Sequence, residues 1–154
     1  KLEVNKNNLS IVKYLSDKNL NVIAHIGVTP QSYVDFKKIR AVGKSEREVK
    51  NLISLANDVE RAGAKAILLE CVFADIAKKI TSSVSIPTIG IGSSKYCDGQ
   101  VLVFDDIINI DNSHKSPKFV KKYMNFEYLA KKAIKKFDKD IKSRKFPSKK
   151  YSYN

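Results

Sequence analysis

The stretch AKAILLECV, residues 64–72, is apolar at nearly every position and carries the acid Glu70 close to its end. A strand that is apolar on both faces is typical of a parallel sheet covered by helices. The preceding segment, residues 45–63, has apolar side chains at helical spacing and begins with a capping box of Ser45 and Glu48. This succession of helix and buried strand predicts an α/β fold with parallel strands and right-handed crossovers.

The same alternation extends along the rest of the chain. We expect parallel strands near 21–28, 65–72, 87–92 and 100–104. Residues 29–44 show no steady period and read as a long loop, and loops of this length are usually functional or mobile.

Further helices are expected at 8–20, 74–84 and 125–146. In the first of these, Leu9, Val12, Leu15 and Leu20 recur at roughly helical spacing. In the last, we expect an apolar stripe to face inward and the lysines to face solvent. The stripe consists of Phe126, Leu129, Ala133, Ile134, Phe137 and Ile141.

The positive charge is concentrated near the C-terminus. Of a formal net charge of +13, residues 115–154 hold 14 Lys and Arg against 3 Asp and Glu, whereas residues 1–114 hold 15 against 13. A basic segment can bind nucleic acid or an anionic membrane surface. Because no aromatic and basic RNA motif accompanies these lysines, we interpret them as a solvated helix face. We expect neither nucleic acid nor a membrane as a partner.

The remaining composition indicates a globular protein of the cytoplasm. The 154 residues are enough for one domain with one sizeable core. The sequence has no apolar run of about 18 residues that would predict a spanning helix, and its first residues lack the pattern of a signal peptide. Cys71 and Cys97 do not have the spacing of metal ligands, so we expect reduced thiols rather than a disulfide.

Polar residues lie at the carboxyl ends of three expected strands, where ligands bind in folds of this class. Burial of Glu70 would raise its pKa and suit it to act as a general base, although a structural carboxylate is an equally open reading. His25 could be a ligand or a proton shuttle, but a hydrogen-bonded core histidine is commoner. The break at Gly90 and Gly92 could cradle an anion or simply allow close packing. Cys71 is interpreted as a small core residue, because no acid–base partner flanks it.

Several segments, in register along the whole chain, together resemble the ketopantoate hydroxymethyltransferase (3-methyl-2-oxobutanoate hydroxymethyltransferase) family. They are HIGVTPQS at 25–32, AGAKAILLECV at 62–72, IPTIGIGSSKYCDGQVLV at 86–103, SPKFVKKY at 116–123 and KFPSKKYSY at 145–153. The resemblance implies a (β/α)8 TIM barrel, of which residues 1–154 form the C-terminal portion of one domain. KLE at 1–3 matches the end of the fourth barrel strand, so the chain would be a piece of a longer protein or a truncated product.

The resemblance also implies an activity in pantothenate and coenzyme A biosynthesis. A hydroxymethyl group passes from 5,10-methylenetetrahydrofolate, the co-substrate, to 3-methyl-2-oxobutanoate, which Mg²⁺ holds through its keto and carboxylate oxygens, and ketopantoate results. By this match Glu70 is the general base, Glu3 a carboxylate of the metal site acting through water, Lys1 a substrate-binding lysine and His25 a substrate contact. The family forms large homo-oligomers, so we expect the same here. The two aspartates of the family's metal site have no counterpart in this chain.

Three positions depart from the family's pattern. Lys37-Lys38-Ile39 replaces Gly-Gly-Tyr in the loop after TPQ, Phe73 replaces a common proline, and Ser93-Ser94 replaces Ala-Gly. We expect the first change to affect loop geometry and folate handling, and the last to cost backbone freedom where glycine can take a positive φ. Two alternatives stay open: another Mg²⁺-dependent 2-oxo-acid carboligase or lyase of the same fold, and a catalytically inactive truncated barrel.

Overall fold

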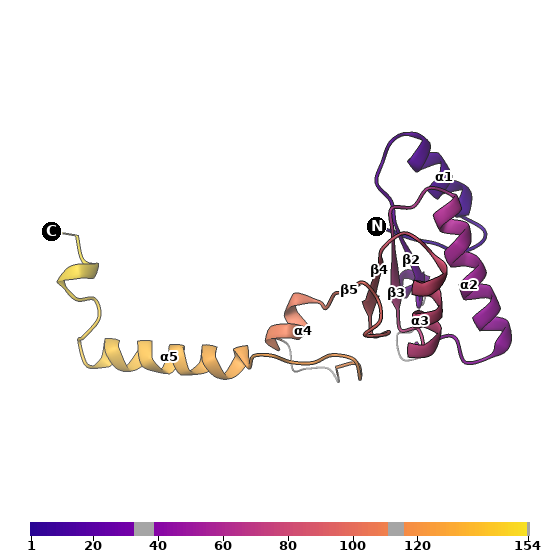
Figure 1. The fold of residues 1–154 in the computed structure, drawn as a ribbon. Coiled ribbons are helices and arrows are strands. Elements are labelled where there is room, and N and C mark those ends of the chain that lie inside the picture. The colour runs from indigo at the N-terminus through magenta and orange to yellow at the C-terminus, as the bar shows by residue number, and fades with distance from the viewer. Residues whose placement is uncertain (33–38, 111–115, 154) are drawn as a thin grey trace. The chain divides into compact units, whose positions relative to one another are not determined.

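The structure is a computed structural model that describes residues 1–32, 39–110 and 116–153 (Figure 1). The chain divides into two compact units, Lys1–Val101 and Leu102–Asn154. We describe each unit by itself. Among the described residues, no helix combines the length and the apolar character that crossing a membrane requires.

The first unit is built on a five-stranded sheet in which every pair of neighbouring strands is parallel. The strands follow one another in sequence order: β1 Leu2–Glu3, β2 Ile23–Gly27, β3 Ala66–Glu70, β4 Thr88–Ile91 and β5 Gly99–Gln100. This arrangement confirms the predicted α/β fold with parallel strands.

The strand predicted at 100–104 is wrong in its extent. β5 is only two residues long, Gly99–Gln100, and helix α4 already begins at Phe104. Val101 and Val103 are 42% and 54% exposed, so the apolar run continues past the point at which the sheet ends. An apolar run forms a strand only where a neighbouring strand pairs with it, and β4 pairs with β5 at Gly99 and Gln100 alone.

Three helices of the first unit, α1 Leu9–Asp17, α2 Glu46–Arg61 and α3 Ala74–Ser83, lie on one side of the sheet (Figure 1). A short 3-10 helix, η1 Pro30–Ser32, follows β2. The predicted first helix is too long at its C-terminal end. Asn19 takes a left-handed φ of 59°, and Leu20 beyond it is 53% exposed rather than part of the apolar stripe.

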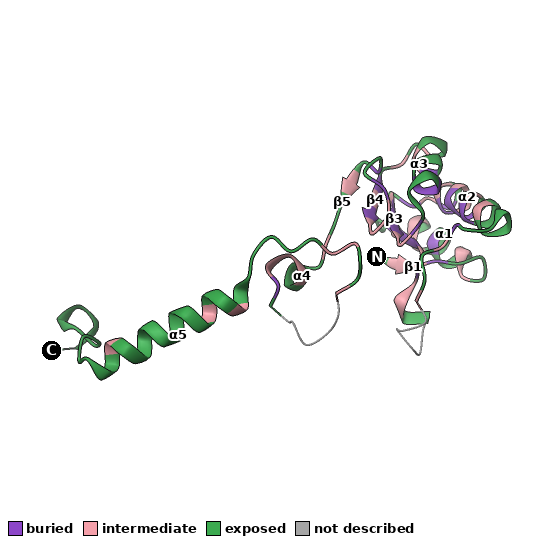
Figure 2. Cartoon of the chain, turned by 90° about the horizontal axis from the view of Figure 1, so that it is seen from below, coloured by how far each residue is buried: buried purple, intermediate pink, exposed green. Residues whose placement is uncertain are grey.

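Helix α2 forms where local signals and burial agree. The Ser45 side chain accepts from the Glu48 backbone N–H, and the Glu48 carboxylate accepts from the Ser45 N–H, which confirms the predicted capping box. These backbone N–H groups lower the pKa of Glu48. The apolar face of α2 packs on the sheet and is buried there (Figure 2). Ala56 and Val59 on this face are fully buried.

The strand register separates two faces of the sheet. Ala24, Ile67 and Thr88 are register partners, and all are fully buried. Ala24 and Ile67 belong to the apolar core that the helices cover. Glu3 and His25, one position further along their strands, are also partners, and side chains alternate between faces. The polar residues of interest therefore lie on the face opposite the helices.

The second unit contains α4 Phe104–Ile108, α5 Phe126–Lys142 and the 3-10 helix η3 Lys149–Tyr151. Helix α5 confirms the helix predicted at 125–146, but the prediction that its stripe faces inward is wrong. None of its residues is buried (Figure 2), and Ile134 is 66% exposed. The apolar stripe is present in the sequence but stays largely exposed, and the ring contact of Phe137 with Phe146 covers only part of it.

Candidate active site at the carboxyl ends of the strands

A histidine between two carboxylates forms the centre of the candidate site. His25 on β2 is 1% exposed, with Nε2 3.1 Å from Glu70 Oε2 and Nδ1 3.8 Å from Glu3 Oε1. Both glutamate side chains are 17% exposed, so each carboxylate can be reached from solvent while the imidazole cannot. The structure thus brings together three of the four predicted site residues. We call these three the Glu3–His25–Glu70 cluster.

Strand register explains this cluster. Glu3 lies beside His25 on the neighbouring strand, whereas Glu70 pairs with Gly27 and reaches His25 diagonally. Neither ring nitrogen makes a hydrogen bond with a described residue, because the contact to Glu70 has a short distance without the required alignment. The imidazole is therefore a buried group without a well-aligned hydrogen bond among the described residues, and its role as a ligand or proton shuttle stays a prediction.

The TPQ motif contributes through its backbone. The N–H of Gln31, in η1, donates to Glu3 Oε1 over 3.3 Å. This contact fixes one carboxylate oxygen of Glu3 and leaves the other available. Sequence reasoning missed this residue, because a backbone N–H leaves no signature in the side-chain pattern.

Gly27 is required at the end of β2. It has a φ of 98°, and a Cβ placed on it would lie 2.4 Å from the carbonyl oxygen of Glu70 and 2.8 Å from Val72 Cγ2. The carbonyl of Glu70 also accepts from the N–H of Val28 over 2.9 Å. Only glycine allows β2 to approach the Glu70 main chain this closely.

The chain turns sharply after Glu70. Cys71 takes a left-handed φ of 51°, which is uncommon for a residue with a side chain. Burial, and then the charge of Glu70, raise the pKa of the Cys71 thiol. A raised pKa keeps the sulfur in the poorly nucleophilic thiol form, so this finding supports the reading that Cys71 is not a nucleophile.

The segment that leads into α2 is bonded to this turn. The N–H of Val42 donates to the Cys71 carbonyl over 2.9 Å, and the N–H of Phe73 donates to the Val42 carbonyl over 3.0 Å. Phe73, one of the departures from the family's pattern, has a φ of −54° that proline could also adopt. Its N–H supplies a hydrogen bond that proline lacks. Of the Lys37-Lys38-Ile39 departure, the two lysines lie outside the described residues.

The GIG and CDGQ segments hold each other rather than forming an anion site. The Asp98 carboxylate accepts from the Thr88 N–H at 2.7 Å and from its hydroxyl at 3.0 Å. These bonds lower the pKa of Asp98. The Gln100 side chain donates to the Ser94 carbonyl at 2.7 Å, and a Cβ on Gly90 would lie 3.0 Å from Gln100 Oε1. The close-packing reading of the glycines is therefore favoured.

The expected backbone cost at Ser93-Ser94 is not found. The left-handed residue in this break is Gly92, with a φ of 62°, and neither serine has a positive φ. Instead, the Ser93 hydroxyl accepts from the Val72 N–H over 3.1 Å and donates to the Leu69 carbonyl over 2.8 Å. The sequence offered no signal for this contact, because the two strands that it joins are distant in the chain.

Lys1 is exposed, and no ion pair or hydrogen bond of its side chain is found among the described residues. A group of at least three His, Cys, Asp or Glu residues arranged to hold a metal ion is also not found in this part of the chain. Mg²⁺ prefers near-octahedral oxygen ligands, and Glu3 supplies a single partly bonded carboxylate. The role of Glu3 at a magnesium site therefore stays a prediction.

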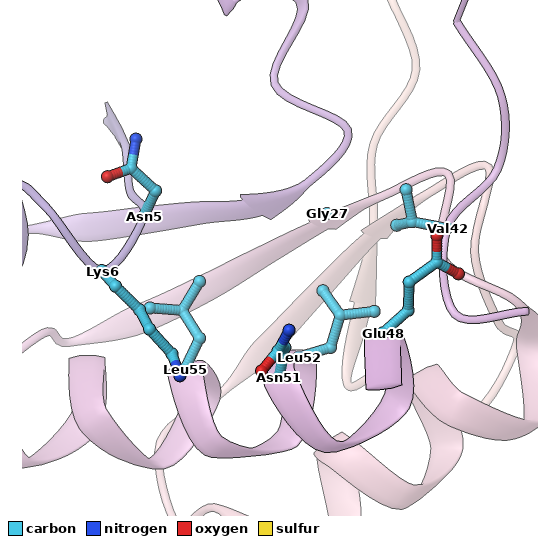
Figure 3. A pocket seen from close by; sticks show the side chains of 8 residues that line it. All are labelled: Asn5, Lys6, Gly27, Val42, Glu48, Asn51, Leu52 and Leu55. Atoms are coloured by element: carbon cyan, nitrogen blue, oxygen red, sulfur yellow. The ribbon is translucent and has the colours of Figure 1, made fainter. Parts of the chain in front are cut away.

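A cavity of about 280 Å³ lies away from the cluster, between α2 and the strands that it covers (Figure 3). Leu52 and Leu55 form its floor on α2, and Asn5 and Lys6 approach it from the chain after β1. Glu3, His25 and Glu70 do not line it. Its lining is partly apolar, and its one acid, Glu48, is already bonded to the N–H groups of residues 43–45, so it does not extend the candidate active site.

Comparisons with known proteins agree on one family. The model of the family described as ketopantoate hydroxymethyltransferase matches residues 1–149. Proteins named 3-methyl-2-oxobutanoate hydroxymethyltransferase are 42% identical in Francisella tularensis subsp. tularensis (strain FSC 198), over 100% of this chain and 58% of the relative, and 44% identical in Pyrococcus abyssi, over 98% and 53%. The Clostridium beijerinckii protein of that name is 42% identical, over 99% and 55%. The chain spans little more than half the length of these curated relatives, and it belongs to the ketopantoate hydroxymethyltransferase family.

Proposed function

We propose that this chain supplies the general base for hydroxymethyl transfer from 5,10-methylenetetrahydrofolate to 3-methyl-2-oxobutanoate, giving ketopantoate. The observation that carries the proposal is the Glu70 carboxylate, 17% exposed and 3.1 Å from a buried imidazole. The Glu70 carboxylate can take the proton beside the keto group, and the buried imidazole of His25 lies against it. The names of the relatives support the substrate and the product.

The proposed roles of the other residues follow from where they lie. His25, whose imidazole lies 3.1 Å from the Glu70 carboxylate, would orient Glu70, and its role as a substrate contact is proposed from the family resemblance. Glu3, fixed by the Gln31 N–H, would hold a water of Mg²⁺, which when bound acts as a Lewis acid on the substrate oxygens. Exposed Lys1 would bind the substrate through its ammonium group.

The five parallel strands in sequence order support the proposal that the chain is the C-terminal portion of a single (β/α)8 barrel. The remaining strands would cover the face that bears the Glu3–His25–Glu70 cluster and supply the other magnesium ligands. We further propose that the complete protein is a cytoplasmic homo-oligomer, which accords with free Cys71 and Cys97. Nucleic acid and membranes are not proposed as partners.

The test joins this chain to the part that it lacks relative to the Francisella protein. That protein's N-terminal segment, fused in frame before Lys1, should allow deuterium from D2O to enter C3 of 3-methyl-2-oxobutanoate in the presence of Mg²⁺, as followed by NMR. Glu70→Gln keeps the shape of the side chain but cannot accept the proton, so exchange should fall roughly 10²–10⁴-fold. Exchange at an undiminished rate in this variant would show that Glu70 is not the base.

Glu60→Gln is the matched control. The Glu60 carboxylate accepts from the Ser85 N–H and hydroxyl at 2.7 and 2.5 Å, and these bonds lower its pKa. It joins α2 to the start of β4, at the opposite end of the strands from Glu70. We expect this variant to lose stability and keep its exchange rate. A fused protein that folds but shows no exchange would favour the inactive barrel instead.

A further inference from the structure

The turn after β3, residues 70–72, is stabilised by a residue that does not belong to β3. Leu69 and Glu70 end the strand, Cys71 takes the left-handed φ of 51°, and Val72 follows with only 2% exposure. A buried N–H such as that of Val72 needs a hydrogen-bond partner. A left-handed conformation in a residue with a side chain persists only where its surroundings determine it.

Ser93 provides both requirements with one hydroxyl. It accepts from the Val72 N–H over 3.1 Å and donates to the Leu69 carbonyl over 2.8 Å. The two groups that it bonds lie on either side of Glu70 and Cys71, so the hydroxyl links the residue before this pair to the residue after it. Alanine, the usual residue of the family's pattern at this position, could make neither bond.

The other main-chain bonds of the turn leave the Val72 N–H to Ser93, whereas the Leu69 carbonyl also lies in the β3–β4 ladder beside Gly90. The Glu70 carbonyl accepts from the Val28 N–H, the Cys71 N–H donates to the Ile91 carbonyl, and both contacts measure 2.9 Å. The main chain of Glu70 is therefore fixed on the β2 side by Val28 and on the β4 side by Ser93. The direction in which the Glu70 side chain leaves the strand depends on both.

We propose that Ser93 is a positioning residue, whose hydroxyl holds the turn in the form that places the Glu70 carboxylate against His25. Ser93 itself reaches no reacting atom, and it acts through the main chain of residues 69–72. The consequence for catalysis rests on the proposed function of Glu70, but the positioning can be measured without any activity.

The experiment compares Ser93→Ala, Ser93→Thr and Ser16→Ala in the full chain. Threonine keeps a hydroxyl and is the conservative rescue. Ser16 is the matched control, because its hydroxyl donates to the Gly63 carbonyl over 3.1 Å, far from the turn. Two readouts by NMR apply: amide hydrogen exchange at Val72, and the nuclear Overhauser effect between the His25 ring protons and the Glu70 side chain.

We expect Ser93→Ala to raise the Val72 exchange rate at least roughly ten-fold and to weaken the His25–Glu70 Overhauser effect several-fold. Ser93→Thr should restore both, and Ser16→Ala should change neither. If Ser93→Ala does not fold, Ser93→Cys, which has similar volume but bonds weakly, replaces it with the same expectations. If Val72 exchanges faster in Ser93→Ala but the His25–Glu70 Overhauser effect is unchanged, Ser93 is merely structural and the proposal is overturned. An unchanged Val72 exchange rate would also overturn it.

Measuring the C3 exchange activity of the fused protein then distinguishes failure of this proposal from failure of the proposed function. In the fused protein, Ser93→Ala should lower the C3 exchange rate at saturating substrate about ten-fold with little change in KM. No exchange in the unsubstituted protein would reject the proposed function, while the two NMR readouts still decide the role of Ser93.

Discussion

Helices α2 and α5 have nearly the same length, 16 and 17 residues, and each begins at a side-chain N-cap, Ser45 or Asn125. Both carry an apolar stripe at helical spacing. Yet α2 buries Leu52, Leu55, Ala56 and Val59, whereas no residue of α5 is buried. The comparison teaches that periodicity determines the helix and its apolar face, but a packed core also needs a surface that fits this face.

The largest effect is expected where the first unit tolerates no side chain. Gly27→Ala adds a Cβ 2.4 Å from the Glu70 carbonyl oxygen at a φ of 98°, and should lower the free energy of unfolding by about 3–4 kcal/mol. In the second unit Arg144 has a left-handed φ of 53°, and Arg144→Gly should be neutral or slightly stabilising. Urea unfolding of both variants checks this. A mild effect of Gly27→Ala would mean that β2 and β3 are not this close.

A pair of matched leucine substitutions addresses the two helices directly. Leu55→Ala in α2, at a position 9% exposed, should cost about 2–3 kcal/mol because it leaves a cavity under the helix. Leu129→Ala in α5, at a position 48% exposed, should change unfolding by less than about 0.5 kcal/mol. Equal losses in denaturant titrations would show that α5 is covered in solution.

A smaller, pH-dependent effect is expected at Asp98. The Thr88 N–H, and then the Thr88 hydroxyl, lower the pKa of this carboxyl from its ordinary value of 3.8. Because the folded pKa is the lower one, the stabilisation is present above pH 3.8 and is lost as the pH falls through the folded pKa.

Because Asp98 is exposed and solvent screens its bonds, Asp98→Asn should cost only about 0.5 kcal/mol at pH 7, and the difference from the unsubstituted chain should shrink below about pH 4. Asp138→Asn, which removes a surface pair with Lys142 in α5, is the control and should cost about 0.5 kcal/mol or less. The measurement is the unfolding midpoint of both variants and of the unsubstituted chain between pH 2 and 7. A constant difference over this range would contradict the assigned bonds.

The smallest effect is expected from the basic face of α5. Replacing Lys131, Lys132, Lys135 and Lys136 with glutamine should leave the unfolding of the first unit unchanged. We also expect no sub-micromolar binding of DNA or RNA at about 0.15 M salt before or after the change. Fluorescence anisotropy with labelled oligonucleotides is the measurement. Tight binding that these substitutions remove would show that the basic face is a nucleic-acid site.

The sequence predicted the fold well where local signals and burial agree. The capping box of α2, the parallel strands and the meeting of His25 and Glu70 were predictable from the pattern, because a parallel sheet brings the carboxyl ends of its strands to one edge. Glu3 was placed with them only through the family resemblance. The role of each of these residues stays a prediction.

What escaped prediction depends on contacts between distant segments. The short extent of β5 depends on pairing with β4, and the exposure of the α5 stripe depends on the surface available to it. The hydrogen bonds of Ser93 and of the Gln31 N–H join residues on different strands or loops. A single sequence encodes such contacts only through the whole fold, so residue type and spacing cannot reveal them.

The bonds at Val42 have a consequence for the entropy of the turn after β3. The N–H of Val42 donates to the Cys71 carbonyl, and the Val42 carbonyl accepts from the Phe73 N–H. Each bond restricts the backbone conformations of residues 71–73, which follow directly after the acid Glu70. Phe73→Pro would keep the backbone angle of the turn but remove one of the two bonds, so the turn would be free to sample more conformations beside Glu70.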